Sequence, residues 1–394
     1  MRVGLFGGSF DPIHNGHLSM IEGALKKVDK IVVIPSCRNA FKRGRILNPA
    51  PYRYYMTVDA LSDYGDKVIV SDIEFFIPGI SYTVNTIKEL LKSKRINKLV
   101  GSDDVELFWI CGSDILPTFD KWYKPEKILK MCSLLVAKRP GQDEGFDDQV
   151  KRVESIYDTK IEEFEINGVE VSSSNVRENR ELMNIPVKAQ EFIKTNALYE
   201  AEWLNQVSDE AMEKFYEFSV ELYPILKRDR LIHTINVAIA SVKYAVKYGA
   251  DPDKALIAGV LHDCAKELPA EEQRKLAIED SGKSYDVKKL WHGPAGAIFA
   301  KRHFGIDDEE ILDAIRYHTT ARKDMTLVDK VVYLADKIEP ARTYDDLTEV
   351  RKVSDEDLQL GLILCVKAFI EKSKVKGLEL HPNTKAFVRE LGLC

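Results

Sequence analysis

Short apolar runs alternate with amphipathic stretches up to about residue 196, and this alternation constrains the fold more than any other feature. Five such runs, rich in β-branched residues, have the length of strands, at 3–6, 31–35, 68–71, 107–111 and 133–137, and K-I-E-E-F-E-I at 160–166 is a sixth strand candidate. The stretches between them, such as 18–27, 52–62 and 84–91, space their apolar residues as helices do. Such alternation predicts an α/β domain whose parallel sheet is covered on both faces by helices. Ligands bind such sheets at the carboxyl ends of the strands.

The strand signals end near residue 208, and helical patterns take over (230–247, 253–266, 294–303, 309–317, 327–338 and 355–372). Asp251-Pro252 marks a helix start, because aspartate accepts hydrogen bonds from a first turn and proline suits the first helical position. A chain of 394 residues also suits two domains better than one. We therefore predict an α/β domain over 1–196 and an all-α domain over 208–394, with the junction within 195–207.

Composition and charge argue against several classes of protein. The formal net charge of −6 does not favour nonspecific binding to nucleic acid or to an anionic membrane. No apolar stretch approaches the ~20 residues that span a bilayer, and the chain begins with a strand-like run instead of a signal peptide. The six cysteines are scattered and form no C-x-x-C pair, which is typical of reduced thiols. We expect a cytoplasmic protein whose ligands are small molecules.

The segment G-G-S-F-D-P-I-H-N-G-H at 7–17 follows the first predicted strand and precedes a predicted helix. Gly7 and Gly8 allow a phosphate to approach the backbone, and the helix offers free N–H groups and a positive dipole end. His14 and His17 are three residues apart and can face one pocket. Two imidazoles with backbone amides would stabilise the charge that grows on the phosphates during nucleotidyl transfer. A glycine-rich turn alone is often structural, whereas the complete string is far more specific.

This string resembles the first signature of the nicotinate/nicotinamide mononucleotide adenylyltransferases, a family with a Rossmann-like fold within the nucleotidyltransferase α/β-phosphodiesterase superfamily. V-S-S-S-N-V-R at 171–177 is similar to the second signature of that family, usually I-S-S-T-x-I-R, and the resemblance covers residues 1–196. Ser173 and Ser174 can cap the helix that follows while Arg177 reaches the ATP phosphates. The resemblance assigns catalysis to His14, His17 and Arg177. It assigns ATP binding to Gly7, Gly8, Ser9, Phe10, Gly112, Asp114, Ser173 and Ser174.

Three further segments resemble the part of that family that holds the pyridine nucleotide. I-S-Y-T-V-N-T at 80–86 is similar to S-Y-T-x-x-T, and C-G-S-D at 111–114 with F-D-K-W at 119–122 is similar to the G-x-D…W segment of the bacterial nicotinate enzymes. In those enzymes the aspartate contacts a ribose and the tryptophan stacks on the pyridine ring, although Trp122 by itself would more often be a core aromatic. L-V-A-K-R-P-G at 135–141 also fits the bacterial pattern. The resemblance assigns pyridine-nucleotide binding to Tyr82, Thr83, Thr86, Trp122 and Arg139.

Lys42 is a candidate contact for the phosphates of ATP. Family members commonly carry P-P-H-K at this point, whereas this chain has N-A-F-K at 39–42, so a surface lysine is the alternative. The reaction implied by the resemblance joins nicotinate mononucleotide and ATP to give nicotinate adenine dinucleotide and pyrophosphate, with Mg²⁺ on the ATP phosphates. Nicotinamide mononucleotide is the alternative acceptor.

Six histidine and aspartate residues of the second half lie in or beside apolar helical patterns. The pair His262-Asp263 follows L-I-A-G-V-L, where an unpaired carboxylate is costly unless a cation or hydrogen bonds satisfy it. Any one such residue is more often a satisfied core side chain, but six together indicate a site for Fe, Mn or Zn. A metal-bound water would then attack a phosphorus centre. The six residues are His233, His262, Asp263, His292, His318 and Asp336.

The order H…H-D…D resembles that of the HD phosphohydrolase superfamily. Four segments are similar to the YqeK-type bacterial proteins, namely 256–267, 290–294, 314–320 and 335–340. The similarity spans about 210–385, with Ala321 in place of the glycine usual in H-T-T-G-R. That family hydrolyses diadenosine tetraphosphate symmetrically to two ADP, and the resemblance implies a dinuclear iron centre, with manganese as the alternative metal.

The resemblance also assigns roles to individual residues of the helical half. One ion would be held by His233, His262, Asp263 and Asp336, and the second site would be completed by His292 and His318. Asp263 would bridge the two ions and take part in catalysis. Substrate phosphates would be neutralised by Lys266 and by Arg316 or Arg322, for each of which a solvated surface position is the alternative.

Two alternatives for the helical half stay open. It could cleave another phosphoester or a nucleotide alarmone, or it could sense nucleotides and regulate the adenylyltransferase without turnover. The intact set of six ligands argues against a pure sensor, and the metal content after purification would separate the two. A nucleic-acid-binding module is disfavoured by the acidic charge and by the lack of a recognition motif.

Overall fold

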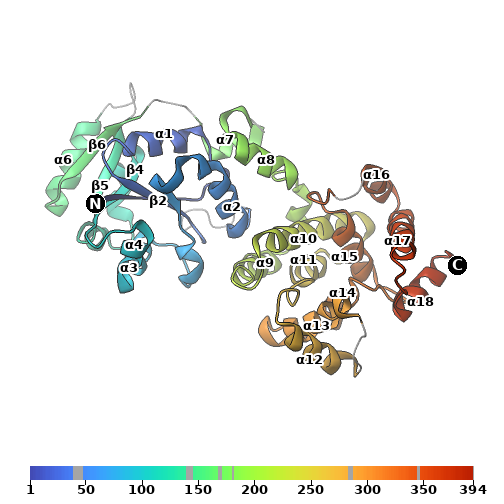
Figure 1. Cartoon of the computed structure of the whole chain (residues 1–394). Coiled ribbons are helices and arrows are strands. Elements are labelled where there is room, and N and C mark those ends of the chain that lie inside the picture. The colour runs from blue at the N-terminus through green and yellow to red at the C-terminus, as the bar shows by residue number, and fades with distance from the viewer. Residues whose placement is uncertain are drawn as a thin grey trace. The chain divides into compact units, whose positions relative to one another are not determined.

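The computed structural model describes residues 1–38, 48–138, 145–166, 171–179, 182–282, 287–343 and 347–393. The chain divides into two compact units, Met1–Lys194 and Thr195–Cys394, each with its own set of secondary-structure elements (Figure 1). In the described residues, no helix combines the length and the apolar character needed to cross a membrane.

The N-terminal unit is built on a six-stranded sheet in which every pair of neighbouring strands is parallel. Its strands are β1 (Arg2–Gly8), β2 (Lys30–Pro35), β3 (Val68–Val70), β4 (Glu106–Gly112), β5 (Ser133–Lys138) and β6 (Ile161–Glu165). All six coincide with predicted strands, so the α/β prediction is confirmed. The order β3-β2-β1-β4-β5-β6 reverses direction between β1 and β4, and ligands bind such sheets at this switch point.

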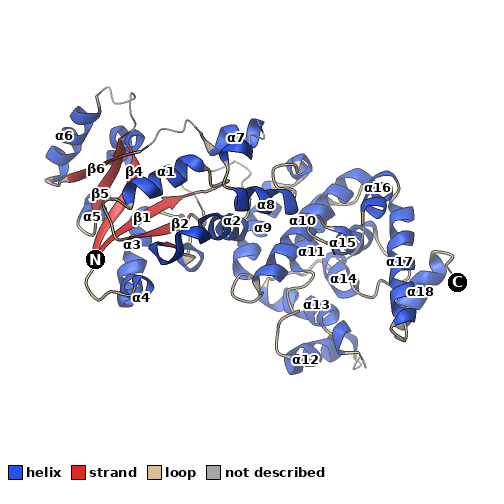
Figure 2. Cartoon of the chain, turned by 45° about the horizontal axis from the view of Figure 1, so that its top comes forward, coloured by secondary structure: helices blue, strands red, loops and turns tan. Residues whose placement is uncertain are grey.

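Helices lie on both sides of this sheet (Figure 2). They are α1 (Asn15–Ala24), α2 (Ala50–Leu61), α3 (Thr83–Leu91), α4 (Arg95–Val100), α5 (Pro125–Leu129), α6 (Phe146–Tyr157), α7 (Ser173–Asn179) and α8 (Val187–Thr195). Alternate strand residues such as Val3, Leu5 and Leu107 form one buried cluster with apolar residues of α3 to α6. Helix α1 packs against β5 and β6, and α2 packs against β2 and β3. The loops after β1 and β4 are thereby held at one edge of a rigid core.

The C-terminal unit contains only helices among its described residues, which confirms the all-α prediction. They are α9 (Asp209–Glu221), α10 (Arg228–Tyr248), α11 (Pro252–Leu261), α12 (Ala270–Ser281), α13 (His292–His303), α14 (Glu309–Tyr317), α15 (Leu327–Ile338), α16 (Thr348–Glu356), α17 (Leu358–Val375) and α18 (Pro382–Glu390). The predicted cap of α11 is confirmed, because Asp251 Oδ1 accepts hydrogen bonds from the N–H groups of Asp253 and Lys254 at 2.9 and 3.1 Å.

Two predicted helices differ from the observed ones. The helix expected over 253–266 ends at Leu261, and turns follow it. The helix expected over 355–372 is interrupted at Asp357, whose extended backbone (φ −146°) ends α16. Its carboxylate accepts a hydrogen bond from Leu360 N–H at 2.9 Å and so caps α17.

Close packing of α10 against α11 depends on Gly259. A Cβ atom at this position would lie 2.6 Å from Ala238 Cα, a distance that two carbon atoms do not tolerate. Glycine therefore lets the two helices approach each other, and His233 on α10 comes near the residues that follow α11.

Two candidate active sites

The end of β1 needs its two glycines because aromatic rings occupy the space beside them. A Cβ atom on Gly7 would lie 2.7 Å from Trp109 Cη2, and one on Gly8 would lie 2.9 Å from Phe10 Cζ. Phe10 itself has a positive φ of 47°, a conformation that costs energy for a residue with a side chain. The end of β1 and the start of the loop after it are therefore held in one shape by packing.

His14 and His17 lie together at the start of α1. His14 precedes the helix in an extended conformation, and its N–H donates to His17 Nδ1 at 3.2 Å. The two rings are stacked with their centroids 3.8 Å apart, while the Phe10 ring packs edge-on against His17. Because Nδ1 of His17 accepts a hydrogen bond, a neutral His17 ring carries its proton on Nε2. The pair thus offers a donor beside the helix N-terminus, as phosphate chemistry requires.

The second signature folds back onto the first. Ser173 Oγ donates to the carbonyl of Pro12 at 3.0 Å, and Arg177 Nη1 donates to the carbonyl of Asp11. Segments that are about 160 residues apart are therefore in direct contact. Arg177 Nη2 also donates to Ser174 Oγ at 3.2 Å.

The cap of α7 is Ser172, whereas the sequence analysis gave this role to Ser173 and Ser174. Ser172 Oγ accepts a hydrogen bond from Asn175 N–H at 3.1 Å. The helix begins at Ser173, and a capping side chain belongs to the residue before the first helical one. Because three serines follow one another at 172–174, the sequence does not show which of them precedes the first helical residue.

A buried arginine, absent from the sequence-based predictions, joins three segments around the loop after β1. Arg53 on α2 is 2 % exposed. Its guanidinium donates to the carbonyl groups of Asn48, Ser9 and Cys37 at 2.9, 2.7 and 3.3 Å. Asp11, also buried, accepts hydrogen bonds from the backbone and side chain of Asn48. The only available signal was a charged residue inside the apolar pattern of the predicted helix at 52–62.

The residues expected to hold the pyridine nucleotide divide into two groups. Tyr82, directly before α3, and Tyr123 have ring centroids 4.7 Å apart, and Trp122 is partly buried against Phe119. Thr83 is the first residue of α3 and is partly exposed. Thr86 is different, because its buried hydroxyl donates to Glu74 Oε1 at 2.7 Å and is committed inside the domain.

The predicted ATP contacts after β4 lie at the switch point of the sheet. Gly112 ends β4, and a Cβ atom there would lie 2.3 Å from Asp114 Oδ1, so glycine allows the carboxylate to turn back over the strand end. Asp114 is exposed. Lys42 and Arg139 lie outside the described residues.

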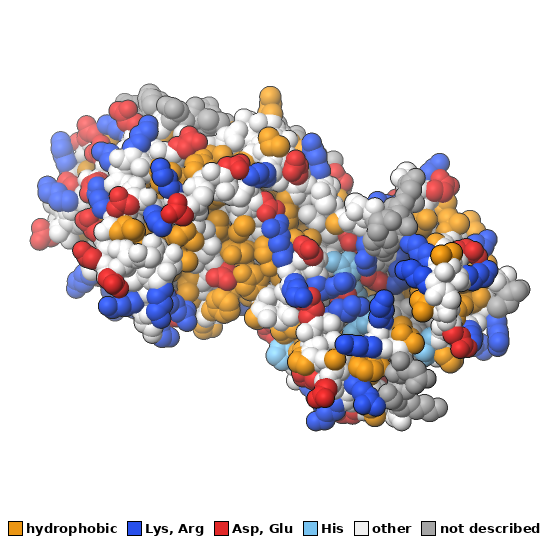
Figure 3. Space-filling model, viewed as in Figure 1, with side chains coloured by type: hydrophobic (Ala, Val, Ile, Leu, Met, Phe, Trp, Pro, Cys, Tyr) orange, Lys and Arg blue, Asp and Glu red, His pale blue; other side chains and the backbone are white. Residues whose placement is uncertain are grey.

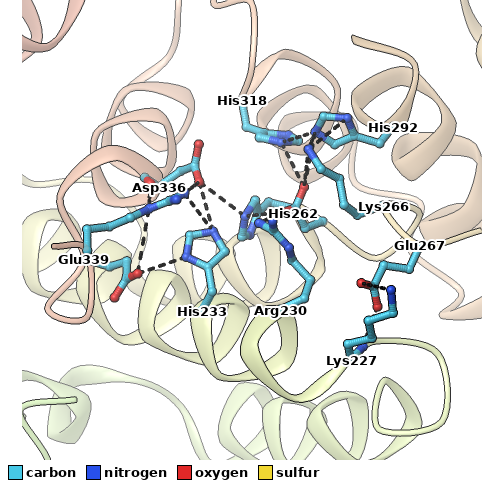
Figure 4. A network of polar contacts seen from close by, with 12 residues as sticks. Lys227, Arg230, His233, His262, Lys266, Glu267, His292, His318, Asp336 and Glu339 are labelled. Atoms are coloured by element: carbon cyan, nitrogen blue, oxygen red, sulfur yellow. Dashed lines mark hydrogen bonds and ion pairs between the residues drawn. The ribbon is translucent and has the colours of Figure 1, made fainter. Parts of the chain in front are cut away.

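All six predicted metal ligands converge inside the helical unit, and all are buried. Figure 4 shows five of them, with His262 between the pair His233 and Asp336 and the pair His292 and His318. They come from five helices: His233 from α10, His262 and Asp263 from the end of α11, His292 from α13, His318 from the end of α14, and Asp336 from α15.

The ligand atoms form two groups that share Asp263. The first contains His233, His262 and Asp263, and the second contains Asp263, His292 and His318, with the ligand atoms of each group within 4.8 Å of one another. Asp263 Oδ1 lies 3.2 and 3.4 Å from the Nε2 atoms of His292 and His318. Asp263 Oδ2 lies 3.6 Å from His262 Nε2. One carboxylate can therefore face two ions at once.

Asp336 completes the first group. Its Oδ1 lies 3.1 Å from His233 Nε2 and 3.7 Å from His262 Nε2. The pKa of Asp336 lies well below its ordinary value, since Lys337 and the imidazoles outweigh the effect of burial. The carboxylate is thus ionised, as a metal ligand must be.

Hydrogen bonds behind the imidazoles turn their Nε2 atoms toward the centre. His262 Nδ1 donates to the carbonyl of Gly259 and His318 Nδ1 donates to that of Ile315, each at 2.7 Å. His233 Nδ1 lies 3.1 Å from Glu339 Oε1. Such outer partners fix the ring tautomer in metal sites. Glu339 was missed in the sequence analysis, although it lies three residues after Asp336.

The donor set fits divalent metal ions. In the described part of the chain, the buried Nε2 of His262 has no hydrogen-bond partner, which a metal bond would satisfy. Burial lowers the pKa of His262 to about 3 and keeps its ring neutral, the form that binds metals. Imidazole and carboxylate together suit ions such as Fe, Mn and Zn.

The cations nearest to the ligands differ in part from those expected. Lys266 Nζ lies 2.9 Å from His292 Nε2, beside the ligand network, and its role toward substrate phosphates stays a prediction. Arg316 and Arg322 instead form ion pairs with carboxylates, Arg316 with Asp280 at 2.8 Å and Arg322 with Asp329 at 2.7 Å. The first pair joins α14 to α12, and the second joins the segment between α14 and α15 to α15.

Two further arginines and a lysine contact the ligands directly. Arg230 Nη1 lies 2.7 Å from Asp263 Oδ2, Arg342 Nη2 lies 2.9 Å from Asp336 Oδ1, and Lys337 pairs with Asp336. These three residues were not predicted from the sequence, because only their contacts in the folded chain distinguish them from surface arginines and lysines.

Comparison with known proteins gives the same division of the chain. Residues 5–179 match the cytidylyltransferase-like family, and residues 230–341 match the HD domain family. The chain is 33% identical over 206 residues to a probable nicotinate-nucleotide adenylyltransferase of Clostridium novyi, covering 50% of this chain and 98% of that protein. It is 40% identical over 162 residues to the symmetrical bis(5'-nucleosyl)-tetraphosphatase of Bacillus subtilis, covering 40% of this chain and 87% of that protein.

A relative from Mycoplasma pneumoniae has both parts in one chain. This probable nicotinate-nucleotide adenylyltransferase/Ap4A hydrolase is 26% identical over 376 residues, covering 92% of this chain and 97% of that protein. The two families expected from the sequence motifs are thereby confirmed. The chain belongs to the nicotinate-nucleotide adenylyltransferase family and, through a second domain, to the HD family of symmetrical bis(5'-nucleosyl)-tetraphosphatases.

Proposed function

We propose that the chain is a bifunctional nucleotide enzyme. Residues 1–194 transfer AMP from ATP to nicotinate mononucleotide, and residues 195–394 hydrolyse diadenosine tetraphosphate symmetrically to two ADP. The observation that carries the second activity is the sharing of Asp263 between two buried groups of metal-binding side chains. The first activity is supported by the contact of the two signatures around His14 and His17.

The adenylyl transfer needs no covalent intermediate with the protein. A phosphate oxygen of nicotinate mononucleotide bonds to the α-phosphorus of ATP, the bond to the bridging oxygen breaks, and pyrophosphate leaves. ATP brings Mg²⁺, which neutralises phosphate charge. His17 Nε2, the His14 ring and Arg177 donate to the oxygens on which charge accumulates. The backbone from Gly7 to Phe10, held by its aromatic neighbours, contacts the phosphates.

The acceptor nucleotide binds beyond β4, by Tyr82, Thr83 and Trp122. The half-buried Trp122 can stack on a pyridine ring while its other edge packs in the core. Thr86 acts indirectly, because its hydroxyl ties α3 to Glu74. Asp114 with Gly112, and Ser173 with Ser174, contact the ATP. Lys42 and Arg139 complete the proposed set.

In the helical unit, His233, His262, Asp263 and Asp336 hold one divalent ion, and Asp263, His292 and His318 hold the second. Iron is the proposed metal, with manganese as the alternative, and such ions supply an acidified water as the nucleophile. The chain keeps Asp263 ionised, because the surrounding imidazoles outweigh burial and hold its pKa well below the ordinary value. Arg230 and Lys266 offset charge on the substrate phosphates.

The free cysteines fit a protein that works in a reducing compartment, and its proposed substrates are small nucleotides. Cys111, Cys132, Cys264 and Cys365 are buried free thiols, which is typical of cytoplasmic proteins. We therefore propose a cytoplasmic enzyme whose partners are ATP, nicotinate mononucleotide and diadenosine tetraphosphate.

The hydrolase activity is tested by its products. Iron- or manganese-loaded protein is incubated with diadenosine tetraphosphate, and the nucleotides are resolved by chromatography beside Asp263→Ala. ADP as the sole product, lost in Asp263→Ala and retained in the surface variant Asp324→Ala, supports the proposal. No turnover, or formation of ATP and AMP, contradicts it.

The adenylyltransferase activity is tested by comparing kcat/KM for nicotinate and nicotinamide mononucleotides with ATP and Mg²⁺. We expect the nicotinate substrate to be preferred and His17→Ala to lower kcat by about 10²–10³. A preference for nicotinamide mononucleotide would overturn the assignment of the acceptor, and an undiminished kcat in His17→Ala would remove the histidine from the mechanism.

A further inference from the structure

Cationic side chains reach the buried ligand network from both of its ends. At one end Arg230 contacts Asp263 and Lys266 contacts His292. At the other end Arg342 and Lys337 contact Asp336. Figure 4 shows Lys266 beside His292, and Asp336 on the other side of His262. On the face of the C-terminal unit drawn in Figure 3, histidine side chains reach the surface among many lysines and arginines.

The two arginines contact carboxylates that both lie near one atom, His262 Nε2. Arg230 contacts Asp263 Oδ2, which lies 3.6 Å from His262 Nε2, and Arg342 contacts Asp336 Oδ1, which lies 3.7 Å from the same Nε2. Arg230 is 30% exposed and Arg342 is 23% exposed. Each side chain is therefore partly exposed, while its guanidinium contacts a buried carboxylate.

The charge of the site calls for a polyanion. Within the described network, the carboxylates of Asp263, Asp336 and Glu339 are outnumbered by the four cations named above. Two divalent ions would add four more positive charges. A tetraphosphate chain carries about four negative charges and would offset them, whereas a single phosphate would not.

The guanidinium of Arg342 contacts both a carboxylate and a histidine of the ligand network. Its Nη2 also lies 3.2 Å from His233 Nε2, so its head group faces the atoms that would bind an ion. Its backbone is fixed independently, because its carbonyl accepts a hydrogen bond from Arg351 Nη2 at 3.0 Å. Its Nε donates to the Asp336 carbonyl at 3.1 Å. Because the guanidinium is planar, the Nε hydrogen bond also fixes the direction of the Nη groups, and Nη2 is held facing the atoms that would bind an ion.

We propose that Arg230 and Arg342 set the cleavage register by each binding phosphates on one side of the bond that breaks. This inference rests on the proposed hydrolase function. One oxygen bridges the second and third phosphorus atoms of the tetraphosphate. Its bond to one of these two atoms breaks, and the oxygen of a water forms a bond to that phosphorus. One ADP leaves with the bridging oxygen, the second ADP carries the oxygen of the water, and the two protons of the water pass to the new terminal phosphates or to solvent. One arginine on each side places two phosphates on either side of the cut.

The experiment separates binding from turnover. ADP binding to manganese-loaded protein is measured by calorimetry for Arg230→Ala, Arg342→Ala, Arg342→Lys and the exposed control Arg389→Ala. We expect each alanine variant at the site to bind ADP about tenfold to a hundredfold more weakly. Arg342→Lys should recover only part of this, because lysine lacks the two-pronged geometry. Manganese content and Tm, measured on the same samples, identify any variant that fails to fold.

The products give the second readout. Loss of one arginine should let the tetraphosphate slide, so that ATP and AMP appear beside ADP in Arg342→Ala. ADP binding equal to that of Arg389→Ala, with ADP still the only product, would overturn the inference. If the unmodified protein does not cleave diadenosine tetraphosphate, the proposed function fails. The calorimetric comparison then still decides whether the two arginines bind phosphate.

Discussion

Glu339→Gln tests whether the residues behind the metal-facing histidines contribute to metal affinity. Glu339 is 2 % exposed, and both of its oxygens are engaged. Oε1 lies 3.1 Å from His233 Nδ1, and Oε2 accepts from Ala341 N–H at 2.7 Å. A glutamine has the same size but only one acceptor oxygen. It can therefore satisfy either His233 or Ala341, and its NH₂ group must face the other donor.

The expected effect follows from the role of such outer partners. Their loss weakens metal binding about 10- to 100-fold, which corresponds to roughly 1.4–2.7 kcal/mol. An ion that binds only the folded protein stabilises it in proportion to its binding free energy. The rise in Tm on adding metal should therefore shrink in Glu339→Gln, by roughly 3–10 °C for a unit of this size.

The assay is a titration of metal-stripped protein with Mn²⁺ in a calorimeter, together with Tm measured with and without saturating Mn²⁺. Glu379→Gln is the matched control, because the Glu379 side chain is 86% exposed and pairs only with Lys385 in the described structure. Equal Mn²⁺ affinities for Glu339→Gln and the control would refute the argument that Glu339 orients a ligand.

Three further changes have expected outcomes. Arg53→Met removes the donor to three carbonyl groups and should cost about 3 kcal/mol or more in urea unfolding; an unchanged midpoint would contradict this. Gly259→Ala places a Cβ 2.6 Å from Ala238 Cα and should lower the unfolding free energy by about 1–3 kcal/mol. It should also weaken Mn²⁺ binding, because α10 and α11 position two of the histidines proposed as ligands. Full Mn²⁺ affinity by calorimetry would mean that the spacing of these two helices is not critical. Burial raises the pKa of Asp308, but Lys254 and two N–H groups of α14 outweigh burial and lower this pKa below 3.8. The contribution of Asp308 to stability is therefore complete above about pH 4 and is lost as the pH falls through the lower pKa of the folded state. The unfolding free energy should thus fall more steeply toward acid in the unmodified protein than in Asp308→Asn, and parallel curves would exclude this contribution.

The sequence predicted what depends on local patterns. Apolar runs predicted the inner strands β1, β2, β4 and β5, since a strand buried on both faces must be apolar along its length, whereas the edge strands β3 and β6 are only partly buried. The clustered histidines and aspartates were proposed as metal ligands because a titratable group in an apolar helix needs a partner. His262 and Asp263 illustrate this, as both are buried at the end of α11.

Residues defined by tertiary contacts could not be predicted in the same way. Arg53 is important for the carbonyl groups around it, and those belong to segments far away in the sequence. Arg230 and Arg342 resemble surface arginines until the fold brings Asp263 and Asp336 beside them. Gly7 is a similar case, because the Trp109 ring that excludes a side chain there comes from another strand.

The packing of Trp109 gives the adenylyltransferase unit an optical reporter of its own active loop. The indole is 5% exposed. One edge lies against Gly7, and its ring centroid is 6.4 Å from that of Trp122. Close-packed interiors transmit small displacements, so a shift of either neighbour changes the surroundings of a fluorophore. The proposed binding of nucleotides at this loop is therefore expected to change the emission of these two indoles, which are two of the four tryptophans in the chain.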